Sequence, residues 1–356
     1  MPKSSRSISR APIAKKSTKF TPNNLPSGIE IIDGNFKGKD IVSLDQFDKK
    51  SIKILFETVP KMRNIAMKAS SSKILAGKII SLLFYEPSTR THDSFEAAIK
   101  QLGGSVIGSP NPAQFSSAIK GEDLYDTIKT EEGYCDLIVL RHPQTKAAQD
   151  AATAATTVPI INAGDGIGEH PTQALLDMYT IYEKFGKLSN LKILLVGDIK
   201  NGRTVHSLLD GLALYQGNEV YLLSTKNLRL PEDEIKQFEN KGLKIHTITT
   251  EDEIPKDAHV WYWTRIQKER FSPKELKNYE KIKNSFIVTA QMLKKHANKN
   301  MILMHPLPRV NEISKEVDSD PRAVYFKQTR NGMYIRMALL ILVLGKQKTI
   351  RPHSKT

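Results

Sequence analysis

The segment Ser88-Thr89-Arg90-Thr91 has the composition of an anion-binding turn. The apolar run before it, Ile79 to Leu83, predicts a buried strand, and the residues from Ser94 onward predict a helix. Free backbone N–H groups and the positive end of the dipole attract anions at a helix N-terminus. Hydroxyl groups add donors, and a guanidinium can bind phosphate through two parallel bonds. We interpret this turn as a phosphate site, although alone it also fits a helix cap with a solvated arginine.

Five further polar segments follow predicted strands, where ligands of open α/β sheets bind. They are Arg141-His142-Pro143-Gln144, Gly164 to Gln173, Gly202 to Ser207, Thr264 to Arg270 and His305 to Arg309. Any one of them, seen alone, is more often a loop with solvated charge than part of a site. The turn after Val196 lacks the G-x-G-x-x-G spacing, so we reject a nicotinamide or flavin site there.

The elements that must position these groups alternate between strands and helices. Strands are predicted at Ile79–Phe84, Ser105–Gly108, Asp136–Leu140, Val158–Asn162, Lys192–Val196, Val220–Leu223, Lys244–Thr247, His259–Trp263, Phe286–Val288 and Met301–Met304. Ser43 and Gln46 fit a capping box and predict a helix over Leu44–Lys68, and a long helix is predicted at Pro171–Phe185. The alternation predicts an α/β fold with two doubly wound domains, each a mostly parallel sheet flanked by helices, joined by long interdomain helices.

A chain of 356 residues suits two domains better than one core. We place the first domain at 41–187 and the second at 188–327, with the apolar helix at 328–345 packing back onto the first. No run approaches the ~18 apolar residues that a membrane span needs, so no membrane association is predicted. Cys135 is the only cysteine, which excludes an internal disulfide and any cysteine-based metal site.

The formal net charge of +15 is concentrated at the two ends of the chain. Residues 1–28 carry six basic residues and residues 346–356 carry four, and neither segment contains an acidic residue. We predict that 1–40 is a basic, disordered extension and that 346–356 is a basic tail. Because no nucleic-acid-binding motif accompanies this charge, nucleic acid is not an expected partner. We expect a cytoplasmic protein, or an organellar one if residues 1–29 act as a transit peptide.

Taken together and in this order, the six polar segments resemble those of the aspartate carbamoyltransferases, over about Leu44 to Leu344. The resemblance implies transfer of a carbamoyl group from carbamoyl phosphate to L-aspartate, an early step of pyrimidine synthesis. It implies that the first domain binds carbamoyl phosphate, that the second binds aspartate, and that no metal or cofactor is needed. It also implies a homotrimer, and it leaves open whether a separate regulatory chain associates with this one.

The resemblance also assigns roles to individual residues. The residues that would hold the phosphate are Ser88, Thr89, Arg90, Thr91 and Arg141. Those that would donate to the carbamoyl oxygen during catalysis are Thr91, Arg141 and His170. Those that would orient the carbamoyl amide are Gln173 and the carbonyl groups of Pro306 and Leu307. Those that would bind aspartate are Arg203, Thr204, Arg265 and Gln267.

Two further sets of residues follow from the same resemblance. Ser116 and Lys120 would complete the site of an adjacent subunit, with Lys120 touching both substrates. Glu86, Arg203 and Arg270 would pair across the two domains when these close on the substrates, although such a pair can also be an ordinary surface contact.

Two alternatives remain beside this interpretation. A carbamoyltransferase for another amino acid, such as ornithine, typically carries a cysteine near the His-x-Leu-Pro motif, whereas here that motif is His305 to Pro308 and the cysteine is Cys135. A non-catalytic paralogue should have lost an arginine of the site, yet all four are present: Arg90, Arg141, Arg203 and Arg265. Both observations favour an enzyme that uses aspartate.

Overall fold

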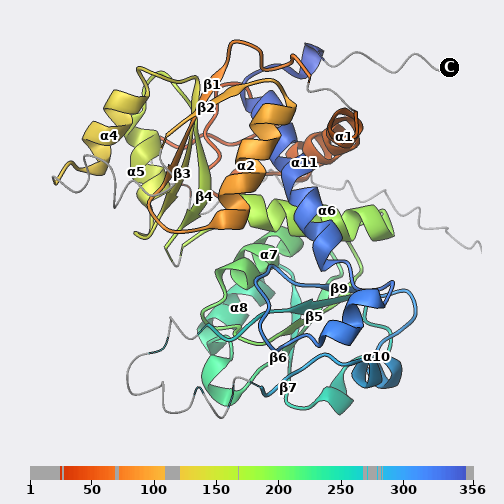
Figure 1. Ribbon diagram of the computed structural model, residues 1–356. Helices are drawn as coiled ribbons and strands as arrows, with labels where there is room; N and C mark the ends of the chain where they lie inside the picture. The colour runs from red at the N-terminus through yellow and green to blue at the C-terminus, as the bar shows by residue number, and fades with distance from the viewer. Residues whose placement is uncertain are drawn as a thin grey trace, which may run out of the picture.

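Two parallel sheets, one in each half of the chain, form the centre of the fold (Figure 1). The computed structural model describes residues 25, 28–68, 72–108, 121–166, 168–267, 271, 279, 282 and 284–349. Every strand pair in the described sheets runs parallel, and helices flank both sheets. The predicted α/β class is therefore confirmed.

The first sheet has four strands in the order β2-β1-β3-β4. Its strands are β1 (Ile79–Phe84), β2 (Ser105–Ile107), β3 (Leu137–His142) and β4 (Ile160–Asp165). The helices of this half are α1 (Lys49–Ala66), α2 (Thr89–Gln101), α4 (Leu124–Glu131) and α5 (Ala147–Ala154). Successive β1 side chains face opposite layers: Leu82 packs in the cluster that contains Phe95 of α2, and Leu83 in the cluster that contains Ile128 of α4. Burial on both faces explains the continuous apolar run of β1.

The second sheet has five strands in the order β7-β6-β5-β8-β9. Its strands are β5 (Lys192–Val196), β6 (Glu219–Leu223), β7 (Lys244–Ile248), β8 (Val260–Trp263) and β9 (Ile302–Met304). The helices of this half are α7 (Arg203–Ala213), α8 (Glu232–Asn240) and α10 (Ala290–His296). The expected strand at Phe286–Val288 is wrong: only an isolated bridge from Val288 to Ile313 forms there.

Strand order reverses between β1 and β3 in the first sheet and between β5 and β8 in the second. In open α/β sheets a crevice opens at such a switch point, beyond the carboxyl ends of the strands. Ser88, Arg203 and Arg265 lie in segments that follow β1, β5 and β8, and Arg141 lies at the carboxyl end of β3. The topology therefore brings the polar segments of both halves to sheet edges where a ligand can lie.

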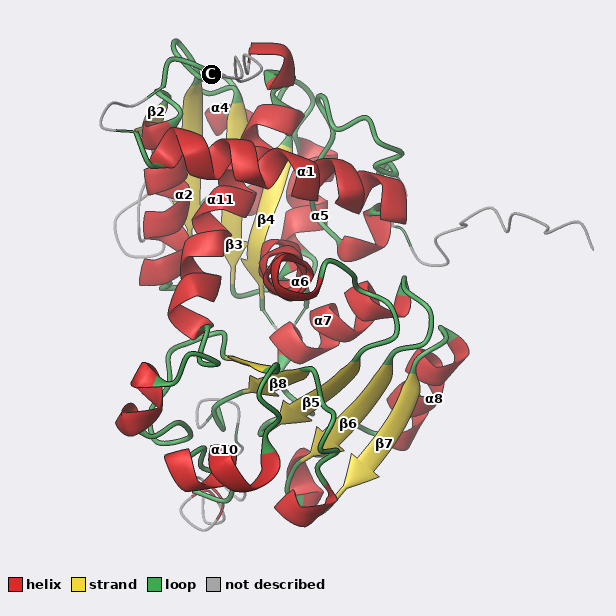
Figure 2. Ribbon diagram, turned by 90° about the vertical axis from the view of Figure 1, so that its right-hand side faces the viewer, coloured by secondary structure: helices red, strands yellow, loops and turns green. Residues whose placement is uncertain are grey.

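Two long helices connect the halves, as predicted. Helix α6 (Pro171–Phe185) lies between the two sheets and packs against α7, and α11 (Tyr325–Val343) packs against α1, α2 and α6 (Figure 2). Almost every residue of the second half of α11 is buried, which explains its apolar sequence on all sides. No helix within the described ranges has both the length and the apolar character to cross a membrane.

The predicted N-terminal elements need two corrections. The capping box of Ser43 and Gln46 is present, but it closes only a single 3₁₀ turn, Leu44–Gln46. Phe47 is then extended and fully buried, and α1 begins at Lys49 with Asp48 as its cap. Helical periodicity continues through this break, so the sequence pattern does not reveal it.

The boundary of the predicted disordered extension also lies too far along the chain. Ile32 and Phe36, inside the expected 1–40 segment, are buried in the main core, and the Ile32 N–H donates to the Gln46 carbonyl at 2.8 Å. Ordered structure therefore begins before residue 41. The remaining short helices are 3₁₀ turns at Lys226–Leu228, Glu251–Glu253, Lys315–Ser319 and Gln347–Thr349.

Candidate active site

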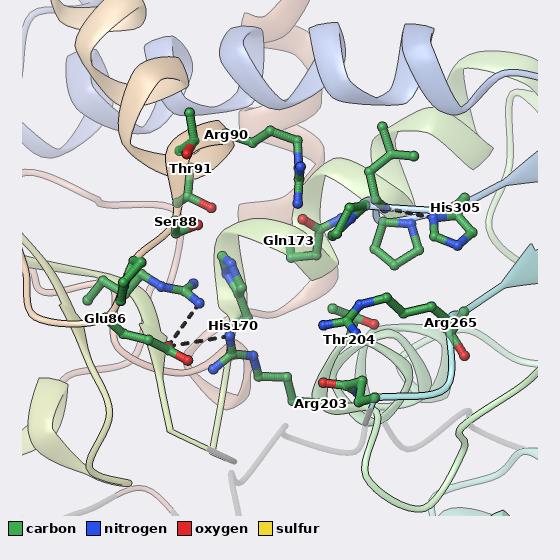
Figure 3. Close-up of a pocket in the computed structure, with 18 of the residues that line it drawn as sticks. Glu86, Ser88, Arg90, Thr91, His170, Gln173, Arg203, Thr204, Arg265 and His305 are labelled. Atoms are coloured by element: carbon green, nitrogen blue, oxygen red, sulfur yellow. Dashed lines mark hydrogen bonds and ion pairs between the residues drawn. The ribbon is translucent and has the colours of Figure 1, made fainter. Parts of the chain in front are cut away.

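A cavity of about 610 Å³ opens between the two halves, where both sets of strand ends meet. Fourteen predicted site residues line it: Glu86, Ser88, Thr89, Arg90, Thr91, Arg141, His170, Gln173, Arg203, Thr204, Arg265, Gln267, Pro306 and Leu307. Figure 3 shows Ser88, Arg90 and Thr91 on one wall and Arg203, Thr204 and Arg265 on the other. The predicted residues Ser116, Lys120 and Arg270 lie outside the described residues.

Three helix N-termini point to this cavity. Helices α2, α6 and α7 begin with the cap residues Ser88, His170 and Gly202, and none of these caps makes a side-chain cap hydrogen bond. No cap side chain therefore occupies these helix ends, and their positive dipole ends remain available to a ligand. Helix α2 starts at Thr89 rather than near Ser94, which places the predicted phosphate turn inside its first turn. This arrangement favours an anion.

Glu86 bridges arginines of the two halves. Its Oε2 atom lies 2.9 Å from Arg141 Nη2 and 3.7 Å from Arg203 Nη2, and Arg203 Nη1 also donates to the Gly166 carbonyl. Glu86 and Arg203, two of the three residues expected to pair on domain closure, thus lie at ion-pair distance. Because Glu86 is the single acidic residue among four arginines in the described cavity lining, the cavity retains a strongly positive potential.

Backbone irregularity around β4 positions the Arg141 side chain. The register of β3 against β4 shifts between Leu140 and His142, and Arg141 Nη1 donates to the Ala163 carbonyl at 3.1 Å. Gly164, with φ of +118°, lies beside this guanidinium: a Cβ there would stand 2.8 Å from Arg141 Nη1. A glycine is therefore required for both the backbone conformation and the close approach.

We expect Gly164→Ala to lower the free energy of unfolding by about 1–3 kcal/mol because of its positive φ. It should also weaken phosphate binding about ten-fold, because the added methyl group displaces the Arg141 guanidinium. The control is Gly242→Ala, where φ is +100° and no heavy atom lies within 4 Å of the added Cβ. Urea unfolding and phosphate titration calorimetry check both effects, and an equal loss of phosphate affinity in the two variants would contradict the expectation.

His170 is held neutral at the centre of the cavity (Figure 3). Its side chain is buried, and burial followed by the charges of Arg203 and Arg141 keeps the pKa of His170 well below its ordinary value. Nδ1 has no hydrogen-bond partner among the described residues. A neutral imidazole in this place can donate one hydrogen bond to a ligand but is a weak base.

Arg90 and Arg265 face the cavity from opposite halves of the chain (Figure 3). Burial, and next the charge of Arg265, lower the pKa of the Arg90 guanidinium, although an arginine stays protonated at neutral pH. Two guanidinium groups that repel each other across a cavity are best satisfied by ligands with several negative charges. The electrostatics therefore favour a ligand, or a pair of ligands, with several negative charges.

His305 is a residue whose role the sequence did not reveal. It is buried; its Nδ1 accepts from the Leu307 N–H at 2.8 Å, so its Nε2 donates to Glu312 Oε1 at 2.8 Å. Leu307 has φ of +55°, a strained value for a leucine. His305 therefore holds the strained loop of Pro306 and Leu307, two residues that line the cavity. The available signal was a histidine next to two prolines, which alone does not indicate a loop clamp.

One cluster on α2 has the geometry of possible metal ligands. Atoms of His92, Asp93 and Glu96 lie within 4.8 Å of one another. None of the three lines the cavity, and both acids already take part in ion pairs, Asp93 with His92 and Glu96 with Lys100. Surface ion pairing accounts for this cluster, and we assign no metal to it.

Comparison with known proteins defines the class to which this fold and site belong. The model for the aspartate/ornithine carbamoyltransferase carbamoyl-P binding domain matches residues 39–183, and that for the Asp/Orn binding domain matches 189–343. The chain belongs to the aspartate/ornithine carbamoyltransferase family.

Individual relatives narrow the similarity within this family. The chain is 48% identical to aspartate carbamoyltransferase 1, chloroplastic, of Pisum sativum, with 87% of this chain and 80% of that protein covered. It is 49% identical to the multifunctional protein pyr1-3 of Dictyostelium discoideum, but 91% of this chain corresponds to only 14% of that protein. A Trypanosoma cruzi aspartate transcarbamoylase structure, in complex with carbamoyl phosphate and aspartate, matches with a TM-score of 0.79 and 40% identity, covering 87% of this chain and 98% of the other.

Proposed function

We propose that this protein is an aspartate carbamoyltransferase, which joins carbamoyl phosphate and L-aspartate into N-carbamoyl-L-aspartate and phosphate for pyrimidine synthesis. The observation that carries the proposal is one cavity that combines an anion-binding helix N-terminus at Ser88 with arginines from the second half, Arg203 and Arg265. Relatives that carry this name, and a related structure with both substrates bound, support it.

Carbamoyl phosphate would bind on the first half of the chain. The groups proposed for its phosphate are the N-terminus of α2 with Ser88, Thr89, Arg90 and Thr91, and the Arg141 guanidinium. Thr91, Arg141 and His170 would donate to its carbonyl oxygen. Because burial and the neighbouring arginines lower the pKa of His170 and make its imidazole a weak base, its role would be donation rather than proton removal. Gln173 and the carbonyl groups of Pro306 and Leu307 would accept from the carbamoyl NH₂ group.

Aspartate would bind on the opposite wall. Arg203 and Arg265 would each bind a carboxylate, with Thr204 and Gln267 as additional polar contacts. A neutral or cationic acceptor side chain would leave one of these two guanidinium groups without its anion, which is a strong basis for discrimination. The amine nitrogen would then face the carbamoyl carbon held on the first wall.

The reaction would proceed by direct attack. The neutral amine of aspartate forms a bond to the carbamoyl carbon, and the carbonyl oxygen becomes an oxyanion that Thr91, Arg141 and His170 stabilise. The C–O bond to phosphate then breaks, and the leaving phosphate takes the amine proton. Placing both substrates in one cavity supplies much of the rate enhancement, because it replaces an encounter in solution by a fixed geometry.

The direct test is to incubate the purified protein with carbamoyl phosphate and either L-aspartate or L-ornithine, and to quantify the carbamoylated product. Product from aspartate alone is expected. Product from ornithine would show instead that the assigned aspartate clamp of Arg265 and Gln267 is wrong. Product from neither would favour the non-catalytic paralogue.

We further propose a homotrimer in which Ser116 and Lys120 of each subunit complete the site of its neighbour. Lys120→Ala and His170→Ala should each be nearly inactive alone, because every site lacks one group. After the two variants are dissociated and reassembled together, some sites contain an intact Lys120 and an intact His170 from different chains, so activity should return. No recovery, together with a monomer mass by light scattering, would refute shared sites. An added regulatory chain would appear as a separate species in pull-downs from the source cells.

The compartment is proposed from the composition of the N-terminal segment. A cytoplasmic location is the expectation, with an organelle as the alternative if residues 1–29 are a transit peptide, because the segment is basic and lacks acids. A fluorescent reporter fused behind residues 1–29 distinguishes the two: a diffuse signal supports the cytoplasm, and an organellar signal supports import.

A further inference from the structure

A carboxylate behind the cavity wall receives hydrogen bonds from three different elements. Asp177 of α6 is fully buried. Its Oδ1 accepts from Gln173 Nε2 at 3.0 Å and from Gln328 Nε2 of α11 at 2.6 Å, and its Oδ2 accepts from the hydroxyl of Tyr262 of β8 at 2.7 Å. Gln173 belongs to the described cavity lining whereas Asp177 does not, so Asp177 has no direct contact with a ligand there.

The bonds to Asp177 fix which way two side-chain amides point. A side-chain amide has a donor NH₂ and an acceptor oxygen. Gln173 and Gln328 both bond to Asp177 Oδ1, which accepts. The NH₂ groups of Gln173 and Gln328 must therefore turn toward Asp177, which leaves both amide oxygens free for other donors. For Gln328 this oxygen accepts from the His305 N–H at 2.9 Å. For Gln173, which lines the cavity (Figure 3), the oxygen is left for a ligand.

The orientations of the Gln173 and Gln328 amides both affect the position proposed for the carbamoyl NH₂ group. Under the proposed function the Gln173 oxygen is one acceptor, and the carbonyl groups of Pro306 and Leu307, which line the same cavity, are the others. These carbonyl groups belong to the loop that begins at His305, and Gln328 connects the backbone of His305 to Asp177. One carboxylate thus orients acceptors on two sides of the position proposed for the carbamoyl NH₂.

We propose that Asp177 is a positioning residue that makes the site select a carbamoyl group, which has two N–H donors, over an acetyl group, which has none. This proposal rests on the proposed function. If Asp177 were absent, Gln173 could rotate its amide and present NH₂ to the carbamoyl NH₂, so that two donors would face each other. An acetyl group makes no hydrogen bond at this position in either case, so its binding should change little.

The protonation state of Asp177 does not alter this logic. Burial raises the pKa of Asp177 to about 7, while the Tyr262 hydroxyl and the two amides favour its ionised form. A proton on Oδ2 would face the Tyr262 oxygen, and Oδ1 would still accept from both amides. An asparagine can reproduce that arrangement, with Oδ1 as the acceptor and its NH₂ toward Tyr262, whereas a leucine of similar size cannot.

The test compares the KM for carbamoyl phosphate with the inhibition constant of acetyl phosphate, using formation of carbamoyl aspartate as the signal. For Asp177→Leu we expect the ratio of acetyl phosphate inhibition constant to carbamoyl phosphate KM to fall about ten-fold, because one buried amide is mispaired. Asp177→Asn should keep the ratio of the wild type. Gln328→Met removes the bonds of Gln328 to Asp177 and to the His305 N–H but keeps the bond of Gln173 to Asp177, so it should lower the ratio less. This variant covers the case in which Asp177→Leu does not fold.

The control is Thr180→Val, one turn further along α6, which likewise removes a buried hydrogen-bonding group, here a hydroxyl, but lies outside this network. It should leave the ratio unchanged. Parallel rises of both constants in Asp177→Leu and Gln328→Met, or a drop in the ratio for Thr180→Val of the same size, would overturn the proposal, because either indicates general loosening. A wild-type protein that forms no carbamoyl aspartate would instead refute the proposed function, which keeps the two failures distinguishable.

Discussion

Replacing His170 with alanine should lower kcat about 10²–10³-fold, with smaller changes in the KM for either substrate. The effect is expected on kcat because the lost hydrogen bond strengthens as the carbonyl oxygen gains negative charge, and the loss of one such donor commonly costs this much. His170→Gln retains a donor NH₂ group and should lose less. Steady-state kinetics check both variants, and an alanine variant within a few-fold of the wild type would remove His170 from the oxyanion site.

The same residue gives an expectation for the pH dependence. The pKa of His170 lies well below 6.5, so the imidazole is neutral from pH 6.5 upward and its protonation state does not change in this range. Any rise of rate between pH 6.5 and 8.5 should therefore persist in His170→Gln. If His170 were a general base that titrates near neutrality, the rate would rise through its pKa and this limb would vanish in the variant.

Replacing Arg265 with glutamine should lower kcat/KM for aspartate about 10²–10³-fold, because removing one partner of a buried charge pair leaves a carboxylate without its counter-charge. The KM for carbamoyl phosphate should change only slightly, since its proposed contacts lie on the opposite wall. Arg265→Lys should recover part of the loss, because it keeps the charge but not the planar fork. Initial rates with each substrate varied in turn measure these effects.

The matched control for Arg265 is Arg330→Gln, an exposed arginine on α11 that is absent from the described cavity lining. It removes the same charge and should leave both constants within a few-fold of the wild type. A comparable fall in the two glutamine variants would mean that net charge, rather than a specific contact of Arg265, governs aspartate binding. A rise in the carbamoyl phosphate KM alone would place Arg265 in the phosphate site instead.

Most of the strands and the long helices were accessible to sequence reasoning, because their signals are local. Strand β1 and helix α6 (Pro171–Phe185) follow directly from the patterns of apolar residues in the sequence. The break at Phe47 was not accessible, because the same apolar residues suit a continuous helix. Phe47 is extended because burial in the core outweighs helical continuity, and that is a tertiary effect.

The members of the site were predicted by type and order, but not their contacts. The bond from Gln328 to Asp177 joins residues 151 positions apart, and that from Tyr262 to Asp177 joins residues 85 apart. No periodic pattern in a sequence indicates which residues so far apart will contact each other. The bonds of His305 to Leu307 and Glu312 span only two and seven positions, but no residue type or spacing marks them in the sequence, so the loop clamp was missed. The turn at Ser88, whose parts are adjacent in the chain, was singled out from the sequence, and its residues line the cavity.

The most direct test of the central claim is a crystal structure with a single molecule that carries both ends of the reaction, a phosphonate joined through an acetyl group to aspartate. We expect the phosphonate at the N-terminus of α2, against Ser88 to Thr91, and the two carboxylates against Arg203 and Arg265. The bridging carbonyl oxygen should lie within hydrogen-bond distance of His170. A molecule bound outside this cavity, or bound with its carboxylates on Arg90 and its phosphonate on Arg265, would contradict the account.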